Sequence, residues 1–125
     1  MPSPYLNARL RSFGHAFRGL ALLLRTQHNA RIHALATVLV LAAGAFLGLS
    51  RFEWVLIVLV IGGVWVAEAF NTAIEFLVDL ASPEIHPLAG KAKDVAAGAV
   101  LITAIASVIV GVLIFGPHIL RLVVG

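Results

Sequence analysis

Polar and apolar positions alternate along the start of the chain with the period of a helix. Apolar side chains recur at steps of four and three residues, which places them on one stripe: Leu6, Leu10, Phe13, Phe17, Leu20 and Leu24. Basic side chains fall on another face: Arg11, His15, Arg18 and Arg25. A helix that is apolar on one side and basic on the other lies in the headgroup plane of a bilayer. We therefore predict a surface helix over residues 6–26.

Three longer apolar stretches follow, and the second continues as an amphipathic pattern: residues 34–50, 54–67 continuing to 80, and 95–117. A helix that crosses a bilayer needs about 20 mainly apolar residues. We predict that three helices contain the spans, over residues 32–50, 53–80 and 91–122. The predicted fold is all-α and integral to the membrane, with residues 1–125 as one membrane domain.

The composition agrees with this prediction. Hydrophobic residues make up 61% of the 125 residues and charged residues 12%, against about half and one quarter in ordinary soluble domains. The chain has no cysteine, which excludes disulfides and thiolate chemistry. The net charge of +3 does not indicate a nucleic-acid partner, because no basic run is interleaved with aromatic residues.

The basic residues predict the orientation in the membrane. Five arginines precede the first predicted span, where no acid occurs: Arg9, Arg11, Arg18, Arg25 and Arg31. Lys91 and Lys93 lie between the second and third spans, whereas the opposite side has only Arg51 and Arg121. Positive residues collect on the cytoplasmic side. The N-terminus and the connection over residues 80–90 are therefore expected in the cytoplasm.

Small residues at fourfold spacing indicate close helix packing. They are Gly44 and Gly48 in the first span, and Thr103, Ser107 and Gly111 in the third. Glycine is also generally frequent in membrane helices, so a single pair is weak evidence. Three spans form a thin bundle, and we expect a homo-oligomer.

An acidic row carries the candidate chemistry. Glu68, Asn71, Glu75 and Asp79 are spaced by three, four and four residues, so all four project from one face of a helix. Each acid at a membrane centre costs about 2.5–3.5 kcal/mol on insertion scales. A divalent cation and basic partners would compensate. Lys93 and Asp94, which open the third helix, return the chain to the same interface and offer a phosphate-binding ammonium and an oxygen ligand.

The segments E-A-F-N-T-A-I-E-F-L-V-D (68–79) and A-G-K-A-K-D-V-A-A-G-A-V-L (89–101) resemble the prokaryotic diacylglycerol kinase family, which includes undecaprenol kinases. The resemblance covers nearly the whole chain. It implies a homotrimeric bundle in the bacterial cytoplasmic (inner) membrane that uses Mg²⁺ to transfer the γ-phosphoryl group of ATP to a lipid hydroxyl. The partners it implies are ATP, a membrane lipid alcohol such as diacylglycerol or undecaprenol, and further copies of the chain.

The resemblance also implies roles for individual residues. Glu68 would be the general base, and Glu75 would bind the metal. Nucleotide and phosphates would be held or organised by a further set: Asn71, Asp79, Glu84, Ile85, His86, Lys93 and Asp94. His28, Asn29, Arg31 and His33 match the family pattern, although Arg31 can equally be an ordinary flank of the first span.

One position departs from the family. Gln27 stands where many members have a glutamate at the metal site, and a neutral amide offers a carbonyl oxygen but no charge. Gln27 is therefore either a weak metal ligand or a sign of lower metal affinity.

Two other functions compete with that of a lipid kinase. In a small transporter or pore subunit the acids would line an ion path, but such a path should carry ionisable residues at mid-membrane on more than one helix. The first and third spans have none there. A structural helper protein would leave the acidic face unexplained.

Overall fold

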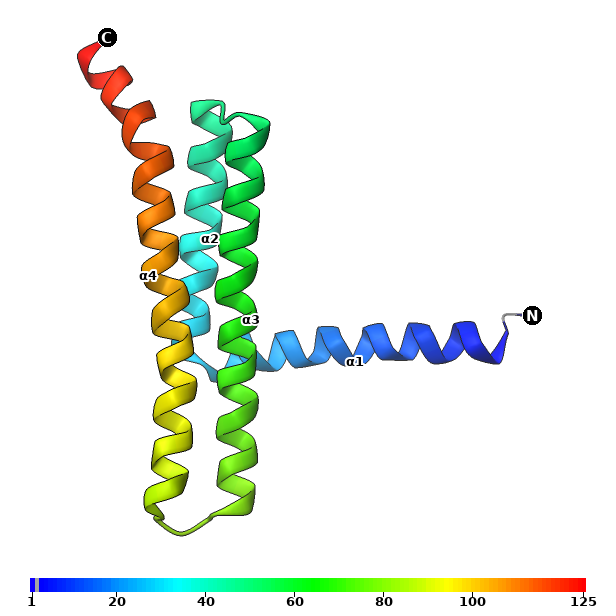
Figure 1. The fold of residues 1–125 in the computed structure, drawn as a ribbon. Coiled ribbons are helices and arrows are strands. Elements are labelled where there is room, and N and C mark those ends of the chain that lie inside the picture. Colours follow the sequence, from blue (N-terminus) through cyan, green and yellow to red (C-terminus); the bar gives the residue numbers. More distant parts are fainter. Residues whose placement is uncertain (2) are drawn as a thin grey trace.

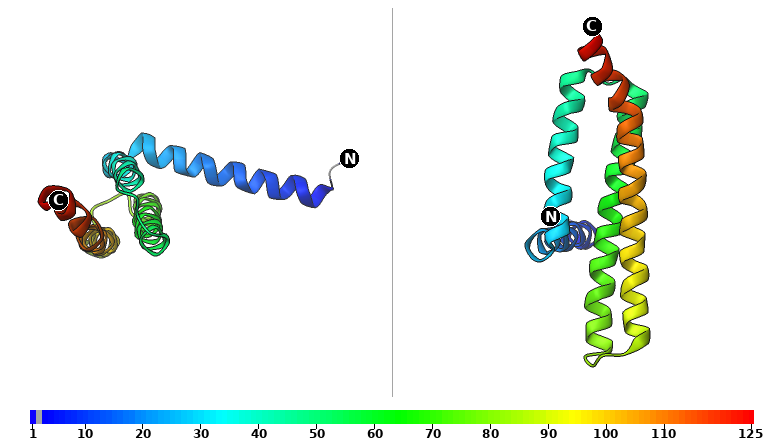
Figure 2. Two further views of the ribbon diagram at one scale, coloured as in Figure 1. Left: turned by 90° about the horizontal axis from the view of Figure 1, so that it is seen from above. Right: turned by 90° about the vertical axis from the view of Figure 1, so that its left-hand side faces the viewer.

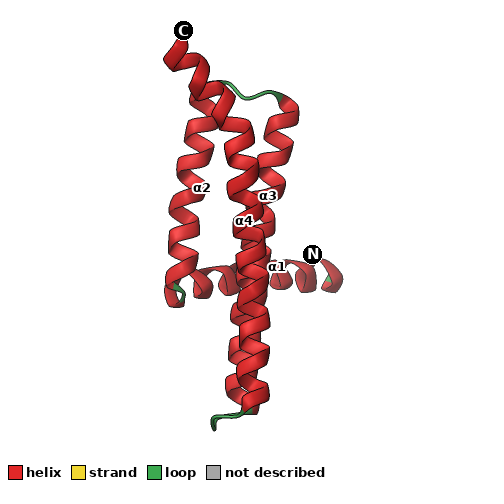
Figure 3. Ribbon diagram, turned by 60° about the vertical axis from the view of Figure 1, so that its left-hand side comes forward, coloured by secondary structure: helices red, strands yellow, loops and turns green. Residues whose placement is uncertain are grey.

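The structure is a computed structural model that describes residues 1 and 3–125. It consists of four helices: α1 (Pro4–Thr26), α2 (His28–Leu47), α3 (Arg51–Ala81) and α4 (Pro87–Val124). No strand occurs in the part of the chain that the structure describes (Figure 3). The prediction of an all-α fold with one amphipathic helix and three long apolar helices is confirmed.

The long helices form an upright bundle, and α1 extends sideways from it (Figure 1). Viewed from above, α2, α3 and α4 form a triangle and α1 extends away from it (Figure 2). The α3–α4 hairpin continues well beyond the level of α1, whereas α2 begins at that level (Figure 1). α3 packs extensively along α4 and makes fewer contacts with α2 and α1.

The corner between α1 and α2 consists of one extended residue, Gln27. Arg31, one turn into α2, donates from Nε to the carbonyl oxygen of Leu24 at 2.9 Å and from a terminal nitrogen to that of Arg25. These are carbonyls that the end of a helix leaves without intrahelical partners. Arg31 therefore fixes the angle between the surface helix and the first long helix.

The two glycines of α2 have different roles. A Cβ on Gly44 would lie 2.7 Å from Trp54 Cη2 of α3, so Gly44 does allow close packing. Gly48 has a φ of 68° and nothing within 4 Å of an added Cβ. The expectation that Gly48 is a packing residue is wrong, because it instead ends α2 in the left-handed conformation that glycine tolerates.

At the end of the bundle away from α1, polar contacts fix the start of α3 and join it to α4. Ser50 and Glu53 form a reciprocal capping box at the start of α3. His118 of α4 lies with Nε2 2.9 Å from Glu53 Oε2, which joins the two helices. Pro117 falls inside α4, and the last turns of the helix bend away from the bundle (Figure 1).

The chain is a membrane protein. The three helices α2, α3 and α4 are each long and apolar enough to cross a bilayer. The apolar stripe predicted on α1 is exposed along its whole length, as a lipid-facing stripe would be. Few apolar side chains are buried, and the small core is formed by Leu49, Ile57 and Ile114.

Candidate active site

The acidic row of α3 runs from the buried middle of the molecule to its exposed end. Glu68 is 1% exposed, and with Ile57 it is one of the two large side chains that are essentially fully buried. Asn71 and Glu75 are half-buried, and the Asp79 side chain is 64% exposed. One helix face therefore carries carboxylates from a closed environment into an open one.

Three oxygens near the buried end of this row have no hydrogen-bond partner. They are Glu68 Oε1, Asn71 Oδ1 and Thr72 Oγ1, which lie within about one turn of α3. His33 Nε2 of α2 approaches Glu68 Oε1 to 3.1 Å, but the ring is not aligned for a hydrogen bond. Because native proteins satisfy nearly all buried polar atoms, these three oxygens make this part of α3 a candidate binding site.

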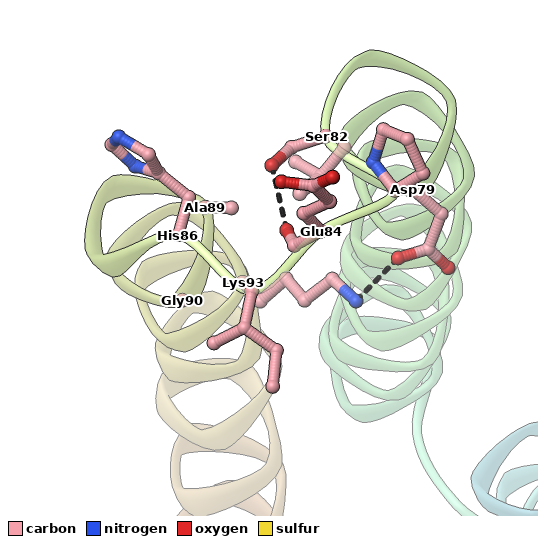
Figure 4. A pocket seen from close by; sticks show the side chains of 10 residues that line it. Asp79, Ser82, Glu84, His86, Ala89, Gly90 and Lys93 are labelled. Atoms are coloured by element: carbon pink, nitrogen blue, oxygen red, sulfur yellow. Dashed lines mark hydrogen bonds and ion pairs between the residues drawn. The ribbon is translucent and has the colours of Figure 1, made fainter.

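The exposed end of the row forms a polar cavity of about 250 Å³ between α3, the connecting loop and α4. Lys93 Nζ lies 2.6 Å from Asp79 Oδ1 across the cavity (Figure 4). Its walls include Asp79, Ser82, Glu84, Ile85, His86, Gly90 and Lys93. The structure thus brings together five of the residues predicted to hold a nucleotide.

The loop that closes this cavity is ordered by its own hydrogen bonds. Ser82 Oγ donates to the carbonyl oxygen of Glu84 at 3.0 Å. His86 accepts the backbone N–H of Leu88 at Nδ1, which caps α4, and its ring is turned away from the Asp79–Lys93 pair (Figure 4). Asp94, predicted beside Lys93, is exposed and does not line the cavity.

An apolar groove of about 310 Å³ lies between α1 and α3. Its lining comes from both helices: Ala16, Gly19, Leu20, Leu22, Leu23, Ala69, Thr72, Ala73 and Phe76. Thr72 is 4% exposed, and its unpartnered hydroxyl belongs to this otherwise apolar wall. The groove therefore combines lipid-like surroundings with a polar atom one turn from Glu68.

The two predicted metal ligands are not part of a preformed cage. No group of three or more His, Cys, Asp or Glu side chains suited to one ion occurs among the described residues. Gln27 is half-buried and donates from Nε2 to Thr26 Oγ1 at 3.2 Å. Mg²⁺ is usually held by one or two carboxylates together with substrate phosphates and water. Glu75 and the orphaned Asn71 Oδ1 fit an ion that arrives with a nucleotide.

His33 and Thr72 were not predicted as members of the site. The pattern around residues 28–33 marked His33, but its partner lies on another helix and no local spacing identifies it. Thr72 follows Asn71 directly, and its position at i+4 from Glu68 was the available signal.

The long apolar helices carry a buried carboxylate on α3, the same helix that lines both the apolar groove and the polar cavity. The sequence pattern of the family described as prokaryotic diacylglycerol kinase matches residues 14–115. The chain belongs to this family.

Three relatives show the extent of the similarity. An undecaprenol kinase of Bacillus subtilis (strain 168) is 49% identical over 112 residues, covering 90% of this chain and 91% of the relative. A diacylglycerol kinase of Synechocystis sp. is 42% identical over 114 residues, covering 90% of this chain but 65% of the relative. A diacylglycerol kinase of Escherichia coli (strain K12) is 29% identical over 109 residues, covering 87% and 89%.

Family membership establishes the enzyme class. The chain is a lipid kinase, a phosphotransferase with an alcohol group as acceptor, and a kinase implies ATP as co-substrate. The alternatives of a transporter and of a structural helper therefore have no support.

Proposed function

We propose that this chain transfers the γ-phosphoryl group of ATP to the hydroxyl of a membrane lipid alcohol, with Glu68 as the general base. The observation that carries the proposal is the position of Glu68. It is buried, has an oxygen without a hydrogen-bond partner, and lies one turn from the apolar groove on the same helix as the polar cavity.

In the proposed reaction the acceptor O–H bond breaks and its proton passes to the Glu68 carboxylate. The acceptor oxygen forms a bond to the γ-phosphorus, the bond to the β,γ-bridging oxygen breaks, and ADP leaves with the electron pair. Phosphoryl transfer requires mainly positioning and charge neutralisation from the protein. A single carboxylate and a well-placed nucleotide are therefore sufficient machinery.

The polar cavity is proposed to hold the nucleotide. Lys93 would contact phosphate oxygens, and Glu84, Ile85 and His86 would lie beside the rest of the nucleotide. Glu68 and Asp79 are separated along α3 by roughly 16 Å at about 1.5 Å per residue. An extended nucleoside triphosphate can bridge that distance, with its γ-phosphate toward Glu68.

Glu75 lies between these two ends and is the proposed Mg²⁺ ligand, assisted by Asn71 and by Gln27. When bound with ATP, Mg²⁺ would neutralise charge on the β- and γ-phosphates. Asp94 would act from the exposed face of α4 and organise the neighbouring phosphate site.

The lipid would enter through the groove between α1 and α3. A lipid alcohol reaches the enzyme from within the bilayer and ATP from the water, so the reaction requires a site accessible to both. The undecaprenol kinase of Bacillus subtilis is 49% identical to this chain, whereas the diacylglycerol kinase of Escherichia coli, also matched over nearly its full length, is 29% identical. This difference favours a polyprenol over diacylglycerol as acceptor. The arginines before α2 favour a cytoplasmic active site in the bacterial inner membrane.

A homotrimer is also proposed. A second apolar groove, of about 650 Å³, separates α2 from α4, and only a few apolar residues of the single chain are buried. Neighbouring copies would cover such a surface.

The decisive experiment incubates detergent-solubilised protein with γ-labelled ATP, Mg²⁺ and either undecaprenol or diacylglycerol. We expect labelled lipid phosphate, formed faster from undecaprenol, and almost none with Glu68→Gln. No labelled product from any lipid alcohol would refute the proposed reaction, whereas full activity of Glu68→Gln would refute only the role of Glu68.

A further inference from the structure

His33 is held in place beside Glu68 by contacts that the proposed reaction does not use. Its Nε2 lies 3.1 Å from Glu68 Oε1, and its side chain is 22% exposed where that of Glu68 is 1% exposed. Among the described residues this is the single ion-pair contact between α2 and α3. A carboxylate in a closed environment is costly unless a partner stabilises its charge.

The backbone around His33 is anchored to α3 one turn further along α2. Thr37 Oγ1 donates to the carbonyl oxygen of His33 at 2.7 Å and accepts the indole N–H of Trp65 at 3.1 Å. Contacts between α2 and α3 are otherwise sparse. The Thr37–Trp65 bond therefore sets the register of α2 against α3, and with it the position of the His33 ring.

Among the ion pairs of the described residues, His33 is paired with Glu68 alone. From α3 it meets Glu68, and the α4 residues across its groove are apolar or small, including Ala104, Ser107 and Gly111. Arg31 of the same helix is engaged by the last carbonyls of α1. Arg25 is the basic residue of α1 at this corner, and its backbone carbonyl accepts a hydrogen bond from Arg31.

We infer that His33 is a positioning residue for Glu68, an inference that rests on the proposed lipid kinase reaction. An N–H at His33 Nε2, beside Oε1, would stabilise the Glu68 carboxylate in its charged form and leave Oε2 to take the proton of the acceptor hydroxyl. A rotation of the ring would be needed to align this contact as a hydrogen bond.

The test compares His33→Gln, which keeps an N–H donor, with His33→Leu, which has none. His118→Gln is the matched control, because His118 forms the other histidine–glutamate pair at the far end of the bundle. Each variant is assayed for kcat and for KM toward ATP at one pH, in the same detergent and with the same lipid alcohol.

We expect His33→Leu to lower kcat by about ten- to hundredfold, a part of the 10²–10⁴ that a positioned base contributes, with KM for ATP unchanged. His33→Gln should recover most of this loss. His118→Gln should keep the wild-type kcat and the wild-type KM for ATP.

Two outcomes would overturn the inference, and they can be told apart. If the wild type is active and His33→Leu has wild-type kcat, or if His33→Gln restores none of the loss seen in His33→Leu, His33 does not act through Glu68. If the wild type forms no lipid phosphate at all, the proposed reaction fails and this inference fails with it.

Discussion

The bundle contains two histidine–glutamate pairs that join different helices, one at each end of its apolar length. At the far end Glu53 is fully engaged, because Oε1 accepts the Ser50 N–H at 3.0 Å and Oε2 lies 2.9 Å from His118 Nε2. At the level of α1, Glu68 is more deeply buried but has an oxygen with no hydrogen bond, and two further orphaned oxygens lie beside it. Both carboxylate oxygens of Glu53 therefore have partners, whereas Glu68 has an oxygen without a hydrogen bond.

Hydrogen-bond satisfaction distinguishes a structural glutamate from a candidate functional one more clearly than burial does. A satisfied pair stabilises the native fold and leaves nothing for a ligand to bind. An unsatisfied pair costs stability in the free protein, and that cost is recovered when a ligand supplies the missing donors. The difference between the two glutamates can be tested by matched substitutions.

The largest effect is expected from Glu68→Gln. This change should lower kcat by about 10²–10⁴, the range for loss of a general base, while the protein remains folded because a buried charge is removed. Glu53→Gln should keep nearly full activity and lower the melting temperature in detergent by a few degrees. Activity and thermal unfolding are measured on both variants. An equal loss of activity in Glu68→Gln and Glu53→Gln would contradict a functional role for Glu68 that Glu53 lacks.

The packing at the far end should be sensitive to the addition of one methyl group. Gly44→Ala places a Cβ 2.7 Å from Trp54 and should cost about 1–3 kcal/mol of stability through overpacking. Gly111→Ala is the control, since nothing lies within 4 Å of its Cβ in the single chain. Thermal unfolding in one detergent measures both. A larger loss at Gly111 would indicate that its groove is filled by another copy.

A smaller effect is expected at the exposed end of the site. Lys93→Met should raise KM for ATP about tenfold, because a charge-assisted bond to phosphate is lost. Lys91→Met, two residues away and outside the polar cavity, is the matched control and should change KM little. The measurement is initial rate against ATP concentration at saturating lipid. Similar KM values for the two variants would remove the polar cavity from nucleotide binding.

The smallest effect concerns the corner residue between α1 and α2. Gln27→Glu should lower the Mg²⁺ concentration for half-maximal activity by several-fold, since a carboxylate binds this ion better than an amide does. Titration of activity with Mg²⁺ at fixed ATP tests this. An unchanged Mg²⁺ dependence would exclude Gln27 from the metal site.

The sequence was sufficient for the features that depend on local periodicity. The helical arrangement follows from apolar runs and stripes, and the single face of the acidic row follows from its spacing of three and four residues. The contact between Asp79 and Lys93 could also be predicted, because a short connection brings the end of α3 and the start of α4 together.

Features that depend on how separate helices dock could not be predicted in this way. The pairing of His33 with Glu68 requires the register of α2 against α3, which the Thr37–Trp65 bond helps to set. Gly48 looked like a packing residue because its spacing from Gly44 is right, but its backbone conformation ends the helix. Asp94 shares a motif with Lys93, yet adjacent residues on a helix face different directions.

The corner at Gln27 and Arg31 has a consequence for the membrane itself. A bilayer that is thicker or thinner than the apolar length of the helices is accommodated partly by tilting them. Because Arg31 ties α2 to the last carbonyls of α1, a tilt of the bundle would also lift or sink the surface helix that borders the apolar groove. Bilayer thickness would thereby act on the depth of the surface helix beside the proposed base Glu68, and the rate of the proposed reaction would depend on the thickness of the membrane that contains the enzyme.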